Sequence, residues 1–310
     1  MAAATGIVTA ADLRGGSARR RREAVIRRAF GLAAGVSIVI SGLIIVALIG
    51  HAIDFLRQIR FSWLFADGWF ARRNEFSIPT LAVGSLLVGG VAMLIAAPLG
   101  LGSAIYLAEY ARPAHRRALK PIIELLAGIP SIVVGFFALT VISPDVVQKL
   151  FSSATFFNLM AAGIGVGILS TPLVATVAED ALRAVPRSLR EGAYGLGARR
   201  RTTSMRVVVP AATSGIAAAL ILGLSRAVGE TMVVLMVAGG TGGSTFTFNI
   251  LGPGQTATGA MAALAIGSDQ VKGASAAFAS LFFVGLLLFV VTFTLNVVSE
   301  RYVRRARRHG

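Results

Sequence analysis

Seven long uncharged stretches are the feature that most restricts what this chain can fold into. They cover residues 29–53, 76–108, 125–144, 150–178, 207–225, 231–268 and 273–299. A helix that crosses the hydrocarbon core of a bilayer needs about 20 apolar residues. The fifth and sixth stretches are separated only by residues 226–230, which contain no turn signal, so we expect one helix there that ends near Val237. The sequence therefore predicts six spans, at about residues 29–53, 79–107, 125–142, 154–177, 211–237 and 274–298.

The composition also indicates a membrane protein. Only 14% of the residues are charged and the mean hydropathy is +0.76, whereas soluble globular proteins have roughly 25% charged residues. The net charge of +16 comes from short arginine blocks beside the apolar stretches, an arrangement that indicates topology rather than nucleic-acid binding. Cysteine is absent, which excludes disulfides and thiolate metal sites, and the three histidines are scattered. We expect an all-α polytopic protein of the lipid bilayer, with no metal site and no nucleic-acid partner.

The basic residues predict the orientation. Residues 1–28 are polar and contain seven arginines. The uncharged stretch that follows is longer than the apolar core of a signal peptide, which has about 7–15 residues. With both termini cytoplasmic, 23 of the 30 lysines and arginines fall on the cytoplasmic side and six in the outside loops, as the positive-inside rule requires. We expect a multi-pass plasma (inner) membrane protein with basic cytoplasmic tails at residues 1–28 and 300–310.

Residues 179–210 form the longest cytoplasmic segment between two predicted spans and are called the coupling loop here. Four arginines from Arg199 to Arg206 hold this segment on the cytoplasmic side. Both an ordinary basic loop and a short helix that docks closely into another protein agree with its composition. The small residues that favour docking are Gly192, Ala193, Gly195, Gly197 and Ala198.

Two opposite charges, Arg226 and Glu230, lie inside the predicted fifth span. Arg226 is 16 residues after Pro210, roughly 24 Å along a helix, which places the pair between mid-bilayer and its outer half. Each charge costs about 2.5–3.5 kcal/mol there, and an i,i+4 ion pair returns only about 0.2–0.5 kcal/mol in water. We expect this helix face to meet protein or water, as a structural ion pair or as a translocation element whose guanidinium binds an oxyanion. The neutral donors expected beside it are Ser225, Thr231 and Ser131.

Three further features each allow two interpretations. Pro130, inside the predicted third span, exposes a main-chain carbonyl and produces either a packing kink or a polar point in a pathway. The aromatic loop at residues 54–79 is either an interfacial belt or a landing surface for an external partner. The Gly- and Thr-rich loop at residues 238–272 either dips into the membrane or covers a channel mouth.

The chain has no nucleotide-binding motif. None of its three lysines follows the Gly-x-x-x-x-Gly of a phosphate-binding P-loop. If the chain takes part in uphill transport driven by ATP, the ATPase is therefore a separate subunit.

Several motifs resemble those of one transporter family. Residues 191–210 match the spacing of the "EAA" loop of ABC importer permeases, except that Gly192 stands where the motif has alanine. Gly-Ile-Pro-Ser at residues 128–131 and Arg-Ala-Val-Gly-Glu-Thr-Met at 226–232 are more specific. With residues 98–110 and 178–191, they make the chain similar to phosphate-specific ABC importer permeases, nearer the PstC-like than the PstA-like subunits. The resemblance implies a type I ABC importer permease (MetI-like) fold with six transmembrane helices.

The resemblance also implies partners and residue roles. The partners are a second, PstA-like permease, two copies of a PstB-like ATPase that holds ATP and Mg²⁺, and an extracytoplasmic PstS-like phosphate-binding protein. The chain itself is then a channel-forming subunit, not an enzyme, with no cofactor of its own, and it imports phosphate by alternating access. Arg226 and Glu230 are implied in phosphate passage. The residues implied in ATPase coupling are Glu191, Gly192, Ala193, Gly197 and Arg199.

Other functions remain as alternatives. An importer of sulfate or molybdate would use the same kind of oxyanion site. A secondary transporter would use Glu230 as a proton carrier and need no ATPase. An intramembrane enzyme is disfavoured because Arg226 and Glu230 supply no nucleophile and no metal-ligand cluster accompanies them.

Overall fold

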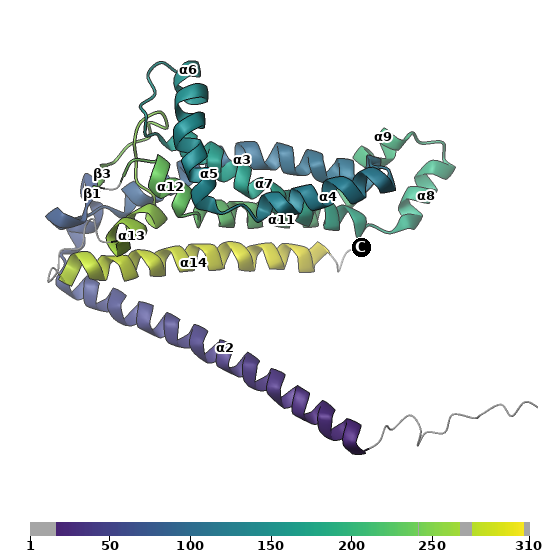
Figure 1. The fold of residues 1–310 in the computed structure, drawn as a ribbon, viewed down its shortest axis with the longest axis horizontal. Coiled ribbons are helices and arrows are strands. Elements are labelled where there is room, and N and C mark those ends of the chain that lie inside the picture. The colour runs from purple at the N-terminus through teal and green to yellow at the C-terminus, as the bar shows by residue number, and fades with distance from the viewer. Residues whose placement is uncertain (1–16, 241, 267–274, 307–310) are drawn as a thin grey trace, which may run out of the picture. The chain divides into compact units, whose positions relative to one another are not determined.

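The computed structural model describes residues 17–240, 242–266 and 275–306, and the fold is dominated by helices (Figure 1). The chain divides into two units, residues 1–50 and 51–310. The described part of the first unit is one helix, α2 (Ser17–Gln58), whose last residues belong to the second unit. Helix α2 contains the predicted first span. It also contains residues 17–28 of the predicted basic tail, whereas residues 1–16 lie outside the described part.

The second unit combines apolar helices with a small antiparallel sheet of order β2-β1-β3. Of its helical segments, η1 and η2 are 3-10 helices, and η3, η4 and η5 are π-helical. In chain order the elements after α2 are η1 (Phe61–Phe65), β1 (Gly68–Phe70), η2 (Ala71–Arg73), β2 (Glu75–Phe76), α3 (Ile78–Ile105), η3 (Tyr106–Tyr110), α4 (Pro113–Ala127), α5 (Ser131–Phe137), η4 (Ala138–Val147), α6 (Gln148–Leu150), α7 (Leu159–Arg183), α8 (Arg187–Gly195), α9 (Arg200–Thr203), η5 (Ser204–Val208), α10 (Val209–Ala211), α11 (Thr213–Val228), α12 (Met232–Val237), β3 (Ser244–Thr245), α13 (Ala257–Ile266) and α14 (Ser275–Ala306).

The described residues include five helices that are long and apolar enough to cross a membrane, or six if one bent pair is a single span. The bent pair is Arg200–Ala211 with Thr213–Val228, at an angle of 70°. This agrees with the six predicted spans, although several bounds differ. The five unbent candidates are Arg21–Gln58, Ile78–Tyr110, Ser131–Leu150, Leu159–Arg183 and Ala276–Arg301. Residue 274, the predicted start of the last span, lies outside the described part.

The third span begins later than the predicted residue 125. Helix α4 ends at Ala127, with Gly128 as its C-cap, and a new helix begins at Ser131 and continues through η4 to Leu150. Pro130 is the N-cap of α5 and not an interior kink. The physical reason is that the residue before a proline avoids the α conformation, while the first turn of a helix tolerates the missing N–H. The predicted bounds 125–142 were therefore wrong at both ends.

The fifth predicted span, residues 211–237, is not one helix. The chain bends at Ala212, between α10 and α11, and breaks again at residues 229–231, between α11 and α12. At the second break the carboxylate Oε1 of Glu230 accepts a hydrogen bond from the main-chain N–H of Met232 at 3.2 Å. In a continuous helix the Met232 N–H would donate to a main-chain carbonyl, and here the Glu230 side chain accepts that hydrogen bond instead. The helix can therefore break at this point without a strong turn motif in the sequence. The prediction of a continuous helix was wrong.

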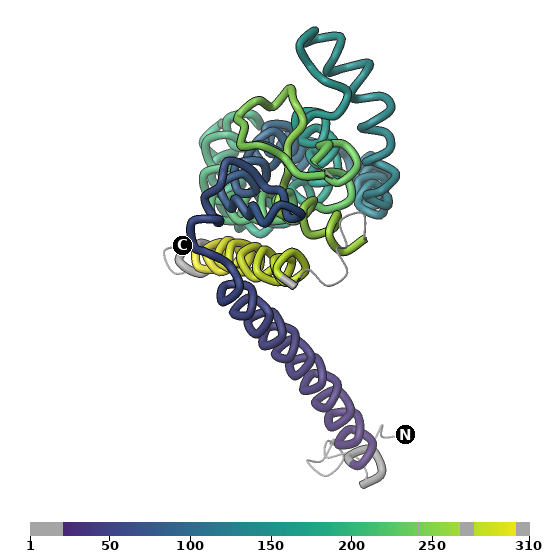
Figure 2. The backbone as a smooth tube through the Cα atoms, turned by 90° about the vertical axis from the view of Figure 1, so that its left-hand side faces the viewer, coloured from purple at the N-terminus to yellow at the C-terminus, as the bar shows by residue number. Residues whose placement is uncertain are grey.

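Helix α7 lies at the centre of the second unit, packed against α3 and α11 (Figures 1 and 2). Of its apolar window 61% is buried, compared with 6% for α14. It starts one turn later than the predicted residue 154 because Asn158 is its N-cap and accepts a hydrogen bond from Ala161 N–H at 2.7 Å. Glycines at 163 and 167 bring α7 against Val91 and Ala92 of α3, as expected for a Gly-x-x-x-Gly helix face.

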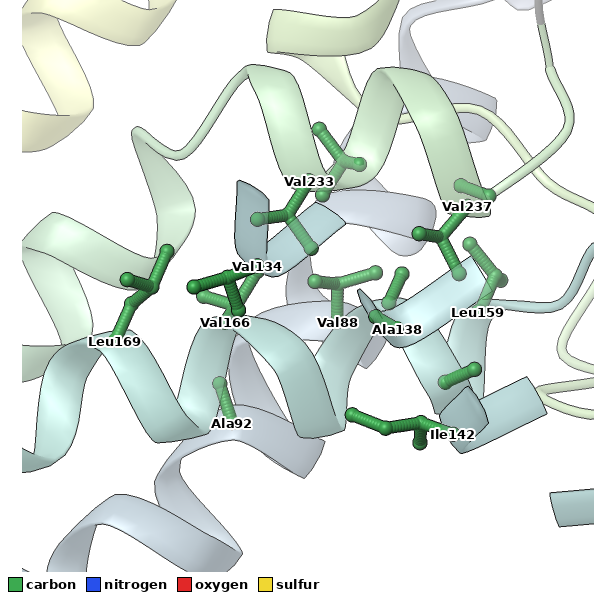
Figure 3. Close-up of a cluster of buried hydrophobic side chains, with 14 of the residues drawn as sticks. Val88, Ala92, Val134, Ala138, Ile142, Leu159, Val166, Leu169, Val233 and Val237 are labelled. Atoms are coloured by element: carbon green, nitrogen blue, oxygen red, sulfur yellow. The ribbon is translucent and has the colours of Figure 1, made fainter. Parts of the chain in front are cut away.

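The main core cluster joins α7 to α5, η4 and α12. Figure 3 shows Val134 beside Val233, with Ala138 and Val237 further along the same direction, so α5 and α12 run side by side in parallel. The two helices approach closely: a Cβ placed on Gly135 would lie 3.2 Å from the Cα of Val233. The start of α5 and the start of α12 therefore lie at the same end of this pair.

The sheet and α13 lie at one end of the second unit, and α8 and α9 lie at the opposite end (Figure 1). Several aromatic residues of the predicted outside loop are core residues: Phe76 is 0% exposed and packs edge-on against Trp69. Phe61 and Phe65 remain exposed. An interfacial belt therefore does not account for those aromatic residues of the loop that are buried in the core. The loop that follows α12 pairs back on itself at Gly239 and Gly254, contains β3, and continues into α13.

This loop is fixed against α3 at one glycine, which gives a stability prediction. A Cβ on Gly84 would overlap the main-chain carbonyl of Gln255. Because overpacking typically costs about 1–3 kcal/mol, we expect Gly84→Ala to lower the thermal midpoint of the purified protein by several degrees. The matched control is Gly90→Ala in the same helix, where a Cβ meets nothing within 4 Å. Equal midpoints for the two variants, measured by fluorescence in detergent, would contradict this packing.

Candidate functional site

Arg226 lies in the last turn of α11, directly before the break at residues 229–231. Its side chain is exposed, and it makes no hydrogen bond or ion pair with any residue that the structure describes. A guanidinium with five free donors is suited to bind planar or tetrahedral oxyanions. Arg226 therefore places a positive charge at a helix break, where it has no partner among the described residues of this chain and is available to bind an anion.

Glu230 is half-buried, and its side chain forms a hydrogen bond with the main chain at the break. Besides the hydrogen bond to Met232, its carbonyl accepts a hydrogen bond from Thr258 Oγ1 at 2.6 Å, which links the break to α13. Arg226 and Glu230, both described, form no ion pair with each other. The i,i+4 pair considered in the sequence requires a continuous helix, and Gly229 ends that helix between the two residues. That interpretation was wrong.

The neutral donors predicted beside the pair are distributed around the break. Thr231 Oγ1 lies 3.4 Å from the Gly229 carbonyl, and both residues line a cavity of about 300 Å³ with Thr258 and with apolar side chains of α13 and α14. Ser225 is half-buried in α11. Ser131 opens α5, one helical turn before Gly135, and so lies at the end of α5 that adjoins the start of α12. The structure thus places Arg226, Glu230, Thr231 and Ser225 at the break and Ser131 at the start of the neighbouring helix.

The coupling loop contains the short helix that its small residues suggest. Glu191, Gly192 and Ala193 lie in α8, and Arg199 is the N-cap of α9. Helix α8 ends in a Schellman motif, because Ala198 N–H donates to the Ala193 carbonyl at 3.0 Å and Gly197 N–H donates to the Tyr194 carbonyl at 2.9 Å. Gly197 has φ +79°, which glycine adopts without strain. Leu196, at the tip of the turn, is 91% exposed. The loop presents a helix end that nothing described in this chain covers.

Two buried carboxylates were missed in the sequence. Glu179, 1% exposed, accepts hydrogen bonds from Arg116 Nε at 2.9 Å and Nη2 at 2.6 Å, and lies 3.4 Å from Lys120 Nζ. Glu109, 6% exposed, accepts from Arg190 Nη2 at 2.9 Å. In the sequence both residues only mark the ends of uncharged stretches. One pattern in the sequence could have predicted their burial: each glutamate follows an apolar stretch and directly precedes a basic segment. Such a segment supplies cationic partners for a carboxylate that is withdrawn from water.

Metal chemistry finds no support in the described residues. They contain no group of three or more histidine, aspartate or glutamate side chains that could hold a metal ion. The polar groups at the break are one guanidinium, one carboxylate and several hydroxyls, which bind and release anions by hydrogen bonds and charge.

Comparisons with known proteins agree with this architecture. The chain is 36% identical over 76% of its length, and 74% of the relative's, to the probable ABC transporter permease protein YqgH of Bacillus subtilis. It is 30% identical to the phosphate transport system permease protein PstC of Mesorhizobium japonicum, over 93% of this chain and 94% of that protein. A second such protein, PstC 1 of Mycobacterium tuberculosis, is 32% identical over 74% of this chain and 72% of that protein.

Solved structures share the fold. A bacterial ABC transporter involved in the import of the acidic polysaccharide alginate matches with a TM-score of 0.60 at 19% identity, over 92% of this chain and 99% of that chain. The MetNI methionine ABC transporter in an inward-facing conformation matches with a TM-score of 0.52 at 19% identity, over 74% of this chain and 93% of that chain. The predicted all-α, MetI-like permease fold is confirmed. A family model also matches residues 96–308. The chain therefore belongs to the family of binding-protein-dependent transport system inner membrane components.

Proposed function

We propose that this chain is the channel-forming permease subunit of an ATP-driven importer that carries inorganic phosphate across the plasma membrane. The observation that carries the proposal is the exposed guanidinium of Arg226 at the break in the fifth span, which has no hydrogen bond or ion pair with any described residue. Relatives named as phosphate transport permeases, similar over nearly the whole chain, support phosphate as the substrate. Members of this family are transport subunits and not enzymes, so ATP hydrolysis belongs to a partner.

The geometry at the break suggests how phosphate passes. A guanidinium offers two parallel N–H donors to two phosphate oxygens, which gives both charge and orientation. Glu230, four residues along the chain, accepts a hydrogen bond from Met232 N–H and forms no ion pair with Arg226, both being described residues, so it does not neutralise the guanidinium. An acidic neighbour lowers the affinity of a cation for an anion, and release requires binding that is not too tight. The hydroxyls of Thr231, Ser225 and Ser131 add neutral donors along the path.

Transport then proceeds by alternating access. We propose that Glu191, Gly192, Ala193, Gly197 and Arg199 form the docking surface for the ATPase. When the ATPase closes on ATP, movement of the coupling loop opens the spans to the outside, where a binding protein delivers phosphate. Hydrolysis returns the pathway to the inside.

Family membership implies an ATPase and a binding protein as partners. We propose the finer composition of one PstA-like permease, two PstB-like ATPase copies holding ATP and Mg²⁺, and one PstS-like phosphate-binding protein. This chain binds no cofactor of its own. Both termini lie in the cytoplasm, as the distribution of basic residues favours.

Uptake by the reconstituted complex tests the proposal. The chain is co-expressed with the products of its neighbouring genes, purified, and reconstituted into vesicles with the external binding protein. We expect radiolabelled phosphate to accumulate only with ATP and Mg²⁺, and an excess of sulfate or molybdate to leave uptake unchanged. Competition by sulfate or molybdate would contradict phosphate as the substrate. Accumulation by this chain alone under a pH gradient would contradict the ATP-driven mechanism.

A further inference from the structure

The buried carboxylate of Glu109 lies where the coupling loop meets α3. It belongs to η3, the π-helical end of that span, and is 6% exposed. Arg190, in the first turns of α8, donates to Glu109 Oε1 through Nε at 3.3 Å and through Nη2 at 2.9 Å. A buried carboxylate needs such a partner because an unpaired charge withdrawn from water is strongly unfavourable. The start of α8 is therefore bound to the end of α3.

Arg190 is itself fixed by the end of α7. Its Nη1 donates to the Val185 carbonyl at 2.7 Å and its Nη2 to the Leu182 carbonyl at 2.8 Å. Leu182 lies in the last turn of α7 and Val185 just after its end, where carbonyls lack the regular helical N–H partner four residues on. One guanidinium thus joins three elements: α7, α8 and the end of α3.

The second arm of the coupling loop reaches the same place. Ser204, at the start of η5, donates from Oγ to Glu109 Oε2 at 3.4 Å. The guanidinium of Arg200, in α9, lies 5.3 Å from the centre of the Tyr110 ring, within the range of a cation–π contact. Both arms of the loop therefore converge on two consecutive residues, Glu109 and Tyr110.

Helix α3 leads from this junction to the candidate translocation site. Gly89 is 20 residues before Glu109, roughly 30 Å along a helix. A Cβ on Gly89 would lie 3.3 Å from Val228 Cγ2 and 3.5 Å from Leu224 Cδ1. These two side chains precede and follow Arg226 in the last turn of α11. A contiguous series of packed groups thus connects the coupling loop with the break.

We propose that Glu109 is a positioning residue that transmits movement of the coupling loop to α3, and through α3 to the Arg226 end of α11. This inference rests on the proposed function, since it assigns the internal link by which the ATPase drives the gate. The three contacts of Glu109 and Tyr110 hold both arms of the loop, so α8 cannot move without displacing the end of α3. Coupling of this kind is carried by packed elements and ion-pair networks between the two sites.

Glu109→Gln in the complete complex tests the link. Glutamine keeps the shape and an acceptor oxygen but removes the charge. We expect the ATPase to co-purify as with the wild type and ATP hydrolysis to stay within about twofold, while phosphate uptake falls about tenfold, inside the roughly 5- to 150-fold range of coupling between sites. The ratio of ATP hydrolysed to phosphate transported rises accordingly. The double variant Glu109→Gln with Arg190→Gln is expected to lose no more than Arg190→Gln alone, because Arg190→Gln already removes the ion pair with Glu109 together with the bonds to the Val185 and Leu182 carbonyls.

Glu179→Gln is the matched control. Glu179 is also a buried carboxylate, but its partners among the described residues are Arg116 and Lys120 of α4 and Arg183 of its own helix α7, and none of these lies in α8, α9 or η5. We expect it to lower the thermal midpoint and to leave the ratio of hydrolysis to uptake unchanged. If Glu109→Gln also lowers the midpoint and leaves that ratio unchanged, Glu109 is only structural and the proposal is overturned.

The experiment separates this link from the substrate. A wild-type complex that hydrolyses ATP in response to the binding protein but takes up no phosphate contradicts the proposed function alone. Stimulation of hydrolysis by the binding protein then measures the same link, because that signal passes from outside to the ATPase through this chain. A reduced stimulation in Glu109→Gln supports the proposal, and an unchanged stimulation overturns it.

Discussion

Arg226→Ala is expected to lower ATP-driven phosphate uptake roughly 100-fold, the largest effect of any single side chain here. Hydrogen bonds to charged groups contribute about 1.5–3 kcal/mol, and about 2.7 kcal/mol corresponds to a factor of 100. Because the Arg226 side chain is exposed and makes no hydrogen bond or ion pair with the described residues of this chain, truncating it should leave the thermal midpoint and the assembly with the partners unchanged. Uptake into vesicles and size-exclusion profiles of the complex measure these two quantities.

Two further variants define what the arginine contributes. Arg226→Lys keeps the charge but loses the planar fork, so we expect partial uptake between that of alanine and the wild type. Arg57→Ala removes an exposed arginine whose charged partner, Asp54, lies 4.0 Å away near the end of α2, and should transport normally. Wild-type uptake by Arg226→Ala would remove this residue from the pathway.

Gly197→Val is expected to weaken binding of the ATPase at least tenfold. Gly197 closes the Schellman motif with φ +79°, and a left-handed conformation costs an L-residue about 1–2 kcal/mol, with β-branched side chains the worst placed. Helix α8 has nine residues, too few to be stable without its caps. Its docking end should therefore lose order when the turn is strained. Titration of the purified ATPase against the permease, followed by a fluorescent label, measures the affinity.

Gly102→Ala is the control for this prediction. Gly102 lies in α3, outside the coupling loop, and a Cβ there meets nothing within 4 Å. Alanine is favoured over glycine in a helix by about 1 kcal/mol, so the variant should bind the ATPase as well as the wild type. Equal affinities of Gly197→Val and the wild type would show that the ATPase does not depend on this turn.

The number of spans was predictable because charged residues bound the apolar stretches. Glu75, Glu109 and Glu179 each stand at the end of a stretch that proves helical, since a charge inside a bilayer is unfavourable. The breaks inside spans were less visible. Pro130 was placed inside a span, as a packing kink or as a polar point in a pathway, because the sequence does not reveal that residues 113–127 form a helix of their own. The break at Gly229 was missed because its hydrogen bonding is completed by Glu230 and by Thr258, a residue 28 positions further along the chain.

The site was only partly predictable for the same reason. Arg226 and the coupling helix follow from residue types at fixed spacing. The pairing of Glu109 with Arg190 joins residues 81 positions apart, and no local pattern carries that information. The expected ion pair of Arg226 with Glu230 illustrates the opposite error, since spacing along the sequence means contact only while the helix continues.

The crowding between α3 and α7 has a consequence for how this chain tolerates change over evolution. A Cβ at Gly100, Gly163 or Gly167 would overlap atoms of the facing helix. These three positions should therefore accept no residue larger than glycine. On α14, where only 6% of the apolar window is buried, changes in side-chain volume should be tolerated as long as the side chain stays apolar. Substitutions among homologous sequences should therefore accumulate on the surface of α14 and be rare at the interface between α3 and α7.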